Sequence, residues 1–313
     1  MRYIRDLKEG SAVKDIYPCK QKNAATTKTG KEYYNVILQD RTGIIDAKIW
    51  DTGNYGIAEF EAHDYVFING EVTTFNGALQ VNIRQARVAD VGDYNELDYF
   101  PITTKDIDEM YAELLGIISK IENGYLKKML EAFFVEDKVF IERFKKSSAA
   151  KSVHHGFIGG LLEHTLSVTR NCDFFAKQYS ILNRDLLLTA AMFHDLGKLK
   201  ELSTFPENDY TDAGNLLGHI VMGVEMLNDQ IRQMDDFPVI LANELKHCIL
   251  AHHGELEYGS PKKPALAEAV ALHYADATDA KLQTLTEIFK EKDTTEWLGF
   301  NRLFDSNLRK TSI

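Results

Sequence analysis

The spacing of the apolar residues changes near residue 103. Before that point, segments such as YYNVILQD (33–40) and GIIDAKIWD (43–51) are rich in β-branched and aromatic residues, as strands are. From TTKDIDEMYAELLGIISKI (103–121) onward, apolar residues recur every three or four positions, as in amphipathic helices, and Thr103 and Thr104 are placed to cap the first one. No strand pattern follows. We therefore predict a multi-domain protein of α and β structure, with a β module followed by an all-α module.

The first module has the pattern of a small barrel. Residues 11–90 contain five strand-like segments separated by turn signals such as Asn76-Gly77. Between the third and fourth lies TGNYGIAEFEAH (52–63), which is long enough for one small helix. Five strands with a helix in that place are the arrangement of an OB-fold β-barrel. The expected division is an OB-fold nucleic-acid-binding domain at 1–90, a linker and helical connector at 91–145, and a second helical domain at 146–313.

The charge is unevenly distributed. The net charge of −11 argues against a nucleic-acid partner, but residues 1–90 are neutral and the acidic excess lies after residue 90. Within the first module, residues 13–31 contain five lysines and only one acidic residue, and we expect them to include a basic loop between the first two strands. A solvated loop with no ligand is the alternative. The candidate nucleic-acid contacts, basic side chains for phosphates and rings for bases, are Lys20, Lys22, Lys28, Lys31, Tyr34, Trp50 and Phe75.

These aromatic candidates compete with a place in the core. Neighbouring residues of a strand point to opposite faces, so at most one of Tyr33 and Tyr34 can face the groove.

Cysteine usage and hydropathy indicate the compartment. Cys19, Cys172 and Cys248 are scattered and form no CxxC pair, which argues against a disulfide framework or a cysteine-ligated zinc ion. No apolar run approaches the roughly 18 residues of a membrane span. The N-terminal residues have no apolar signal segment. We expect a cytoplasmic protein with no membrane partner.

Histidines and aspartates recur inside or beside apolar helical segments of the second module. Any one of them is readily an ordinary core or surface residue, but burying so many unpartnered imidazoles would cost several kcal/mol. Imidazole and carboxylate are natural ligands of Mn²⁺, Fe²⁺ or Co²⁺. Adjacent helical residues point about 100° apart, so the His-Asp and His-His doublets favour two metals. The residues are His164, His194, Asp195, His219, His252, His253 and Asp276.

Their order, H…HD…H…HH…D, resembles the HD superfamily of metal-dependent phosphohydrolases, and HDLGK (194–198) is a specific part of the pattern. The resemblance implies one metal held by His164, His194, Asp195 and Asp276, and another held by Asp195, His219, His252 and His253. We expect two divalent ions, most suitably Mn²⁺, with Co²⁺, Fe²⁺ and Mg²⁺ as alternatives. Mg²⁺ is the least natural partner of imidazole.

Further motifs resemble the YhaM-type bacterial 3′–5′ exoribonucleases: HHGFIGGLLEHT (154–165), HHGELEYGSPKKP (252–264) and ADATDAK (275–281), with an OB-fold in front. The GYP motif of cyclic-dinucleotide phosphodiesterases is missing after the HH doublet. The resemblance runs from about residue 10 to the end of the chain. It implies two-metal hydrolysis of single-stranded RNA from the 3′ end to 5′-mononucleotides, with single-stranded DNA as a second substrate to consider.

Four residues are candidates for roles around the reaction. Asp195 is expected to bridge the metals. Lys198, on a helix expected to continue past His194, is a candidate contact for the reacting phosphate or a cap of the helix end. His155 either touches substrate or makes a structural hydrogen bond. Asp279 is expected to orient a neighbour rather than bind metal.

Two other functions stay open at this point. One is a phosphohydrolase of free nucleotides in which the barrel only binds a partner or regulates. The other is a non-catalytic single-stranded DNA-binding protein, against which the complete ligand set argues. We also expect a homo-oligomer, with the apolar helices at 103–144 as a candidate interface.

Overall fold

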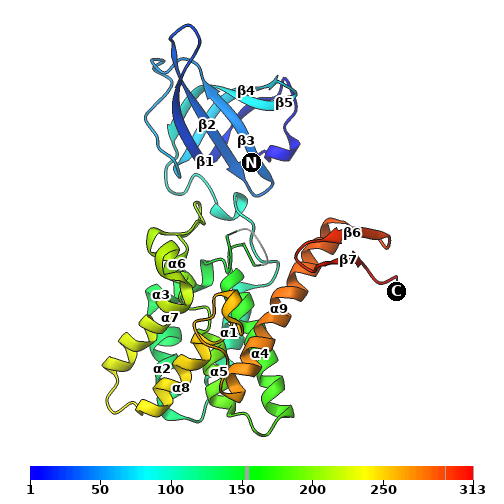
Figure 1. Ribbon diagram of the computed structural model, residues 1–313. Helices are drawn as coiled ribbons and strands as arrows, with labels where there is room; N and C mark the ends of the chain where they lie inside the picture. The colour runs from blue at the N-terminus through cyan, green and yellow to red at the C-terminus, as the bar shows by residue number, and fades with distance from the viewer. Residues whose placement is uncertain (152–154, 293, 313) are drawn as a thin grey trace. The chain divides into compact units, whose positions relative to one another are not determined.

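The computed structural model describes residues 1–151, 155–292 and 294–312 and divides into two compact units (Figure 1). Residues 1–102, with 204–208, belong to the barrel unit, and residues 103–203 and 209–313 to the helical unit. The boundary therefore differs from the expected one. Residues 91–102 group with the barrel, and the helices expected in a connector at 91–145 are part of the helical unit.

The first unit is a closed five-stranded barrel, which confirms the predicted OB-fold. The strands follow the order β1-β2-β3-β5-β4, and the barrel closes where β4 pairs with β1. β3 and β5 run parallel, and the other neighbours are antiparallel. Alternate residues of β2 and β3 fill the interior, among them Val36, Leu38 and Ala47. The bounds are β1 Ala12–Thr26, β2 Glu32–Asp40, β3 Gly43–Ile49, β4 Tyr65–Phe75 and β5 Ala78–Val88.

The helix expected between the third and fourth strands is not present in residues 50–64. Turns take its place: the amide of Gly56 donates to Oδ1 of Asn54 at 2.9 Å, as glycine and asparagine favour. Ile57 then forms a parallel bridge with Ala86 of β5. The segment is thus bound to the barrel wall through its own backbone, which a helix could not offer.

The expected basic loop between the first two strands is also shorter than predicted. β1 continues through Thr26 and pairs with β2 as far as Glu32, so only residues 27–31 form the turn. Most side chains of the last part of β1 are exposed, and it has no alternating apolar residues from which a strand could be recognised.

The second unit consists of helices followed by a hairpin. The bounds are α1 Ile107–Ile118, α2 Gly124–Glu131, α3 Lys138–Lys146, α4 Gly160–Gln178, α5 Arg184–Phe193, α6 Lys198–Glu201, α7 Asp212–Gln233, α8 Val239–Leu250, α9 Ala267–Glu291, β6 Trp297–Asn301 and β7 Ser306–Arg309. A short π-helical segment, Ala132–Glu136, joins α2 to α3. α4 packs against α5 and α9 in the middle of the unit (Figure 1).

The first three helices of this unit belong to its core. Leu114 of α1, Leu130 of α2 and Phe144 of α3 are buried in the same apolar cluster as Leu162 of α4. Their apolar faces are therefore already covered, and the expected homo-oligomer interface at 103–144 loses its basis. The cap of α1 is Asp106 rather than Thr103 or Thr104, and its carboxylate accepts the amides of residues 108 and 109.

The prediction of an all-helical second half was wrong at its end, where β6 and β7 form a hairpin. Both strands are short and largely exposed, so no apolar alternation marks them in the sequence. Among the described helices, none combines the length and apolar character needed to cross a lipid bilayer.

Candidate metal centre

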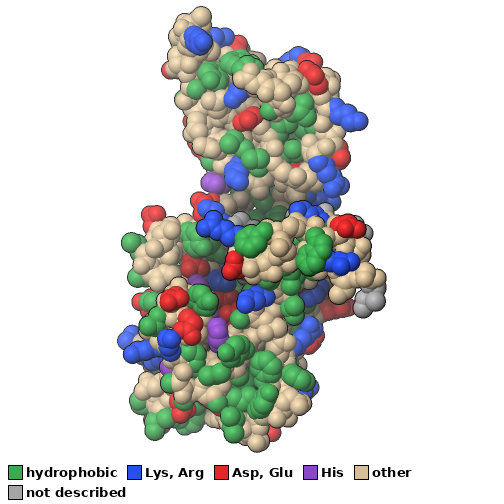
Figure 2. All heavy atoms as spheres, turned by 45° about the vertical axis from the view of Figure 1, so that its right-hand side comes forward, with side chains coloured by type: hydrophobic (Ala, Val, Ile, Leu, Met, Phe, Trp, Pro, Cys, Tyr) green, Lys and Arg blue, Asp and Glu red, His purple; other side chains and the backbone are tan. Residues whose placement is uncertain are grey.

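The seven predicted ligands come together in the helical unit from five separate places. His164 lies on α4, His219 on α7 and Asp276 on α9. The two doublets lie in the turns that directly follow α5 and α8, rather than within helices. Every residue of α5 from Leu186 to Phe193 is buried, which fixes the helix end from which His194 and Asp195 emerge. Histidine and acidic side chains reach the surface of this unit (Figure 2).

One group of ligand atoms forms around His164. Its Nε2 lies 3.1 Å from Nε2 of His194 and 3.2 Å from Oδ1 of Asp276. Oδ2 of Asp195 lies 3.3 Å from the Nε2 atoms of both histidines. A metal–ligand bond of about 2.1 Å places neighbouring ligands about 3 Å apart in octahedral coordination, so these spacings suit a shared metal ion.

A second group consists of His219, His252 and His253, whose ligand atoms lie within 4.8 Å of one another. The other oxygen of Asp195, Oδ1, lies 3.4 Å from Nε2 of His219 and 3.8 Å from Nε2 of His252. The two carboxylate oxygens of Asp195 therefore face two different histidine groups. This is the position that a bridging carboxylate requires.

Each of the five histidine rings is oriented through its Nδ1 atom. Nδ1 of His194 pairs with the carbonyl oxygen of Ala191, and Nδ1 of His252 with that of Ile249, both at 2.7 Å and both three residues back. The remaining three Nδ1 atoms pair with Asp279 (His164, 2.7 Å), Glu201 (His219, 3.0 Å) and the carbonyl oxygen of Tyr258 (His253, 2.8 Å). With the proton on Nδ1, the Nε2 lone pair of each ring is free to bind a metal.

Unsatisfied nitrogen atoms test whether a metal fits. The Nε2 atoms of His219 and His252 are buried and have no hydrogen-bond partner in the described part of the chain. Leaving two buried ring nitrogens without partners is costly. A cation between them and Asp195 removes that cost, so the residues present fit the divalent metal that the HD pattern implies.

The carboxylates of the centre are ionised. Burial disfavours the charged form of Asp195, but Lys198, His194 and His164 together outweigh it and hold the pKa of Asp195 well below its usual range. Burial acts in the same direction on Asp276, yet a hydrogen bond from His164 keeps the pKa of that carboxyl low. Both are therefore anionic near neutral pH, as metal ligands must be.

The imidazoles differ between the two groups. Burial lowers the pKa of His252 well below the usual value, and it lowers that of His253 as well, so both rings are neutral. Burial has the same effect on His164, but its bonds to Asp195, Asp276 and Asp279 outweigh it and raise the pKa. A metal bound by His164 must therefore displace a proton from it.

Close backbone contacts around two glycines position the ligands. A Cβ atom on Gly160 would lie 2.0 Å from the carbonyl oxygen of His155, and one on Gly197 would lie 1.9 Å from that of His219. The first contact sets the start of α4, four residues before His164. The second lets the HDLGK turn approach α7, where a kink at Gly218 (φ 74°) precedes His219.

Lys198 does not lie on a continuing helix as expected, because residues 194–197 form a turn and α6 begins at Lys198. Its Nζ lies 2.7 Å from Oδ2 of Asp195, and its side chain is only 18% exposed. Burial disfavours its charge, but the Asp195 carboxylate outweighs this and raises the pKa of Lys198. The side chain is thus a fixed positive charge beside the ligands.

His155 is buried, with Nε2 3.0 Å from Oδ2 of Asp279, which also pairs with His164. Asp279 therefore orients ligand-side rings, the role expected for it. The preceding His154 lies outside the described residues. Sequence reasoning missed Glu201, which receives hydrogen bonds from both the amide and the ring of His219. The kink at Gly218 leaves that amide without a helical partner, so that it can bond to Glu201. In the sequence, Gly218 was the residue that could have indicated this arrangement.

On the barrel unit, the structure separates the predicted nucleic-acid contacts into two places. Tyr33, rather than Tyr34, stacks on Trp50, with ring centroids 4.8 Å apart, and Phe75 lines the same pocket. Tyr34 lies elsewhere beneath Lys22, whose Nζ is 4.6 Å from the ring centroid.

The predicted lysines of the barrel differ in whether their side chains are bound to the protein or exposed to solvent. Nζ of Lys22 donates to the carbonyl oxygen of Phe60 at 2.6 Å, so this side chain is anchored. Lys20, Lys28 and Lys31 are exposed, the last two in or beside the β1–β2 turn.

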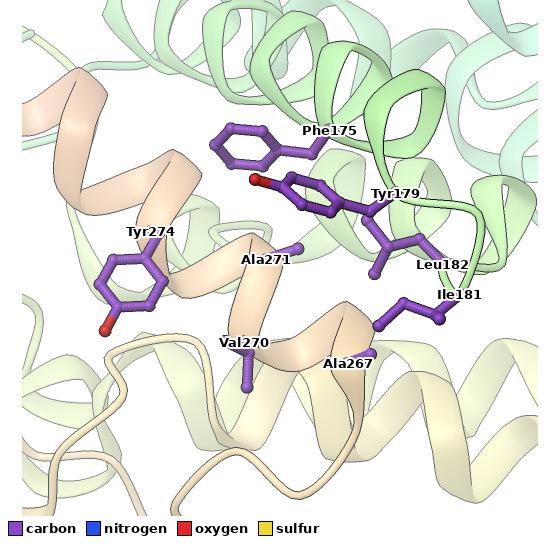
Figure 3. Close-up of a pocket in the computed structure, with 8 residues that line it drawn as sticks. All are labelled: Phe175, Tyr179, Ile181, Leu182, Ala267, Val270, Ala271 and Tyr274. Atoms are coloured by element: carbon purple, nitrogen blue, oxygen red, sulfur yellow. The ribbon is translucent and has the colours of Figure 1, made fainter.

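An apolar pocket of about 560 Å³ lies elsewhere in the helical unit, between the end of α4 and the start of α9 (Figure 3). Phe175, Tyr179, Val270 and Tyr274 are among its lining residues. None of the residues that line it is a candidate metal ligand, so it is not the reaction site.

Known proteins share both units. The protein-family model described as "HD domain" matches residues 161–281, and the family model described as "OB-fold nucleic acid binding domain" matches residues 20–89. The 3′-5′ exoribonuclease YhaM of Listeria welshimeri is 32% identical over 298 residues, which cover 94% of this chain and 93% of that protein. The protein of the same name from Bacillus velezensis is 34% identical, with 87% and 86% covered. The chain therefore belongs to the YhaM family of HD-domain proteins, as its motifs predicted.

Proposed function

We propose that the protein is a metal-dependent 3′–5′ exoribonuclease that hydrolyses single-stranded RNA to 5′-mononucleotides. The observation that carries the proposal is the placement of Asp195, whose two oxygens face separate histidine groups. The similarity to proteins named 3′-5′ exoribonuclease YhaM extends over both units, which supports a substrate that engages barrel and helices alike. A phosphohydrolase of free nucleotides does not need a barrel that binds a nucleic-acid strand.

The proposed cofactor is a pair of divalent ions. One would be held by His164, His194, Asp195 and Asp276, and the other by Asp195, His219, His252 and His253. Imidazole-rich ligation favours Mn²⁺, Co²⁺ or Fe²⁺ over Mg²⁺. When bound, such ions activate water and stabilise the charge that develops on a phosphodiester.

The side chains of the protein supply the rest of the proposed chemistry. Asp195 and Asp276 stay ionised, and the bonds on each Nδ1 hold the rings in the tautomer that leaves Nε2 free. Lys198 is charged and partly exposed, and in the proposal it helps to bind the reacting phosphate. His155 is buried against Asp279, which supports a positioning role rather than contact with the substrate.

The barrel is proposed to hold the RNA strand without contributing to hydrolysis. Lys20 and Lys28 are exposed and available to contact phosphates, and Lys31, also exposed, pairs with Asp51 at 3.9 Å. Exposed rings are available for base stacking. Single-stranded DNA is proposed as a second substrate, to be compared directly with RNA of the same sequence.

The test uses a single-stranded RNA labelled at its 5′ end, incubated with the protein and Mn²⁺. The proposal expects a ladder that shortens from the 3′ end and disappears with EDTA. Asp195→Ala should abolish the ladder yet bind the RNA almost as well as the wild type, whereas Asp235→Ala, at an exposed aspartate, should change neither. Hydrolysis of free nucleotides with the labelled RNA left intact would move the assignment to a nucleotide phosphohydrolase. Binding of single-stranded DNA with no hydrolysis of any substrate would favour a non-catalytic binding protein.

Two further expectations are proposals about context. The three cysteines are free and buried, which fits a reducing compartment, and we propose a cytoplasmic location. The predicted homo-oligomer is proposed without an assigned interface, because the helices at 103–144 are packed in the core, and light scattering of the purified protein tests it.

A further inference from the structure

A pocket of about 340 Å³ lies on the outer surface of the barrel, beside β2, β3 and the β4–β5 hairpin. Tyr33 and Trp50 form one part of its lining, with their rings stacked at an interplanar angle of 27°. Phe75 lines it as well. Trp50 is 44% exposed and Phe75 is 61% exposed, so both rings keep free surface. Exposed rings around a pocket of this size suit a flat aromatic ligand such as a nucleobase.

Most polar groups around this pocket already have a partner. Nε1 of Trp50 donates to Oδ1 of Asn82 at 3.0 Å, and Nζ of Lys48 donates to Oδ1 of Asn35. The indole donor of Trp50 is therefore engaged, whereas the Lys48 ammonium has three N–H donors and keeps two of them. The acceptor for a ligand comes from another side chain of the lining.

That side chain is Asp46. It lines the pocket on β3, in register with Gln80 of β5, and it is exposed. Within residues 1–151, 155–292 and 294–312 its carboxylate takes part in no hydrogen bond or ion pair. A carboxylate only accepts hydrogen bonds, and it accepts two parallel N–H groups well. The pocket thus offers aromatic surface together with one free bidentate acceptor.

Only one of the four RNA bases matches that acceptor. In a single strand the Watson–Crick edge of each base is open to the protein. Guanine presents two adjacent donors there, N1–H and the N2 amino group. Adenine and cytosine each place a ring-nitrogen acceptor beside their amino group, and uracil places a carbonyl on either side of N3–H. A carboxylate facing those edges meets an acceptor, which is unfavourable.

We propose that this pocket is a guanine-selective subsite, with Asp46 as the residue that sets its specificity and the exposed rings as a stacking surface. The proposal rests on the proposed binding of single-stranded RNA. It adds that the barrel distinguishes one base, so the affinity for a strand depends on whether it contains guanine.

The experiment measures binding of the full-length protein, in EDTA to prevent hydrolysis, to a fluorescent oligomer of twelve uridines. Three further oligomers replace one central uridine by guanosine, adenosine or cytidine. We expect the guanosine oligomer to bind about five- to tenfold more tightly than the others. This factor lies at the lower end of the discrimination that a bidentate contact to a base gives, because the site is exposed. Asp46→Asn should reduce this preference to less than about twofold.

The matched control is Glu9→Gln, which removes one exposed carboxylate of the same unit outside the pocket. Both variants lose a negative charge and should bind the uridine, adenosine and cytidine oligomers slightly better, but only Asp46→Asn should weaken binding of the guanosine oligomer and so lose the guanine preference. Trp50→Ala should weaken every oligomer, because stacking does not depend on the base.

Equal binding of the four oligomers by the wild type would overturn the guanine subsite while leaving the exoribonuclease proposal intact. A guanine preference that survives in Asp46→Asn would overturn the role of Asp46. Failure of the wild type to bind or shorten any oligomer would instead refute the proposed function.

Discussion

Glu201 offers a sharp test of how the second histidine group is held. Its Oε1 accepts hydrogen bonds from the backbone amide of His219 at 2.9 Å and from Nδ1 of the same residue at 3.0 Å. Glu201→Ala removes both bonds at once. The ring of His219 is then free to rotate or to place its proton on Nε2, and in either case it is a poorer ligand.

The size of the effect follows from these two contacts. Losing the partner that orients a metal-bound histidine typically lowers metal affinity about 10- to 100-fold. This corresponds to about 1.4–2.7 kcal/mol. The effect should be confined to the group of His219, because the side chain of Glu201 bonds to His219 and, in the described part of the chain, not to His164, His194 or Asp276.

The assay is a calorimetric titration of Mn²⁺ into metal-stripped protein. The wild type should show two binding events, and Glu201→Ala should weaken one of them by the stated factor and leave the other unchanged. Glu268→Ala is the matched control. Glu201 and Glu268 are each 8% exposed, but Glu268 accepts from the amide of Asn183 at 2.6 Å and is not bonded to a candidate ligand.

Circular dichroism of each variant first establishes that it is folded. The reasoning fails if folded Glu201→Ala binds Mn²⁺ as the wild type does. It also fails if Glu268→Ala weakens the same event by the same factor, since the loss would then reflect a general loosening of the helical unit.

Three further outcomes are expected. Saturating Mn²⁺ at about 100 times its Kd should stabilise the helical unit by about 2.7 kcal/mol and raise its Tm by about 5–10 °C, so an unchanged melting curve would argue against a metal site. Gly197→Ala should lower the free energy of unfolding of the unit, measured in urea, by at least about 2 kcal/mol, because its Cβ meets the carbonyl oxygen of His219. Gly116→Ala on α1 has open space around its Cβ and should raise the free energy of unfolding by about 0.4–1 kcal/mol. Equal effects of the two substitutions would contradict the close contact at Gly197. Burial disfavours the charged form of the Asp279 carboxylate, but hydrogen bonds from His155 and His164 outweigh it and hold the pKa of Asp279 well below the usual range. The ionised carboxylate therefore stabilises the folded protein above about pH 4, and this contribution is lost as the pH falls through the folded-state pKa. Asp279→Asn should therefore flatten the pH dependence of the free energy of unfolding in EDTA below about pH 4, and a curve parallel to the wild type would exclude Asp279 as its source.

The residues that gather in the candidate metal centre were predictable, because buried imidazoles and carboxylates leave a strong mark on a sequence. Polar residues such as His194 and Asp195 directly follow an apolar run, and that combination is expensive unless something binds them. The alternation of β2 and β3 was equally visible, since one face of each strand fills the barrel. In these places burial and chemistry both act on residues close together in the chain.

The features that were missed depend on contacts between distant residues or on exposed backbone. Glu201 orients His219 only because the kink at Gly218 turns an amide toward it, and no local pattern reports that geometry. Residues 52–63 form turns and a single bridge from Ile57 to Ala86 of β5 instead of a helix. The outer part of β1 and the hairpin of β6 and β7 are strands with solvent on most of their surface. Without a buried face, such strands lose the alternation from which they are recognised.

The position of the two doublets at helix ends has an electrostatic consequence. α5 and α8 end at Phe193 and Leu250, so the carbonyl ends of both helices, each with about half a negative charge, point toward the residues that follow. The carboxylates of Asp195, Asp276 and Asp279 add to this field, and the ammonium of Lys198 offsets part of it. Before cations arrive, the site attracts positive ions and repels the phosphates of a nucleic acid. In the proposed function, the charge of the site therefore favours an order in which the metals bind first and the polyanionic strand second.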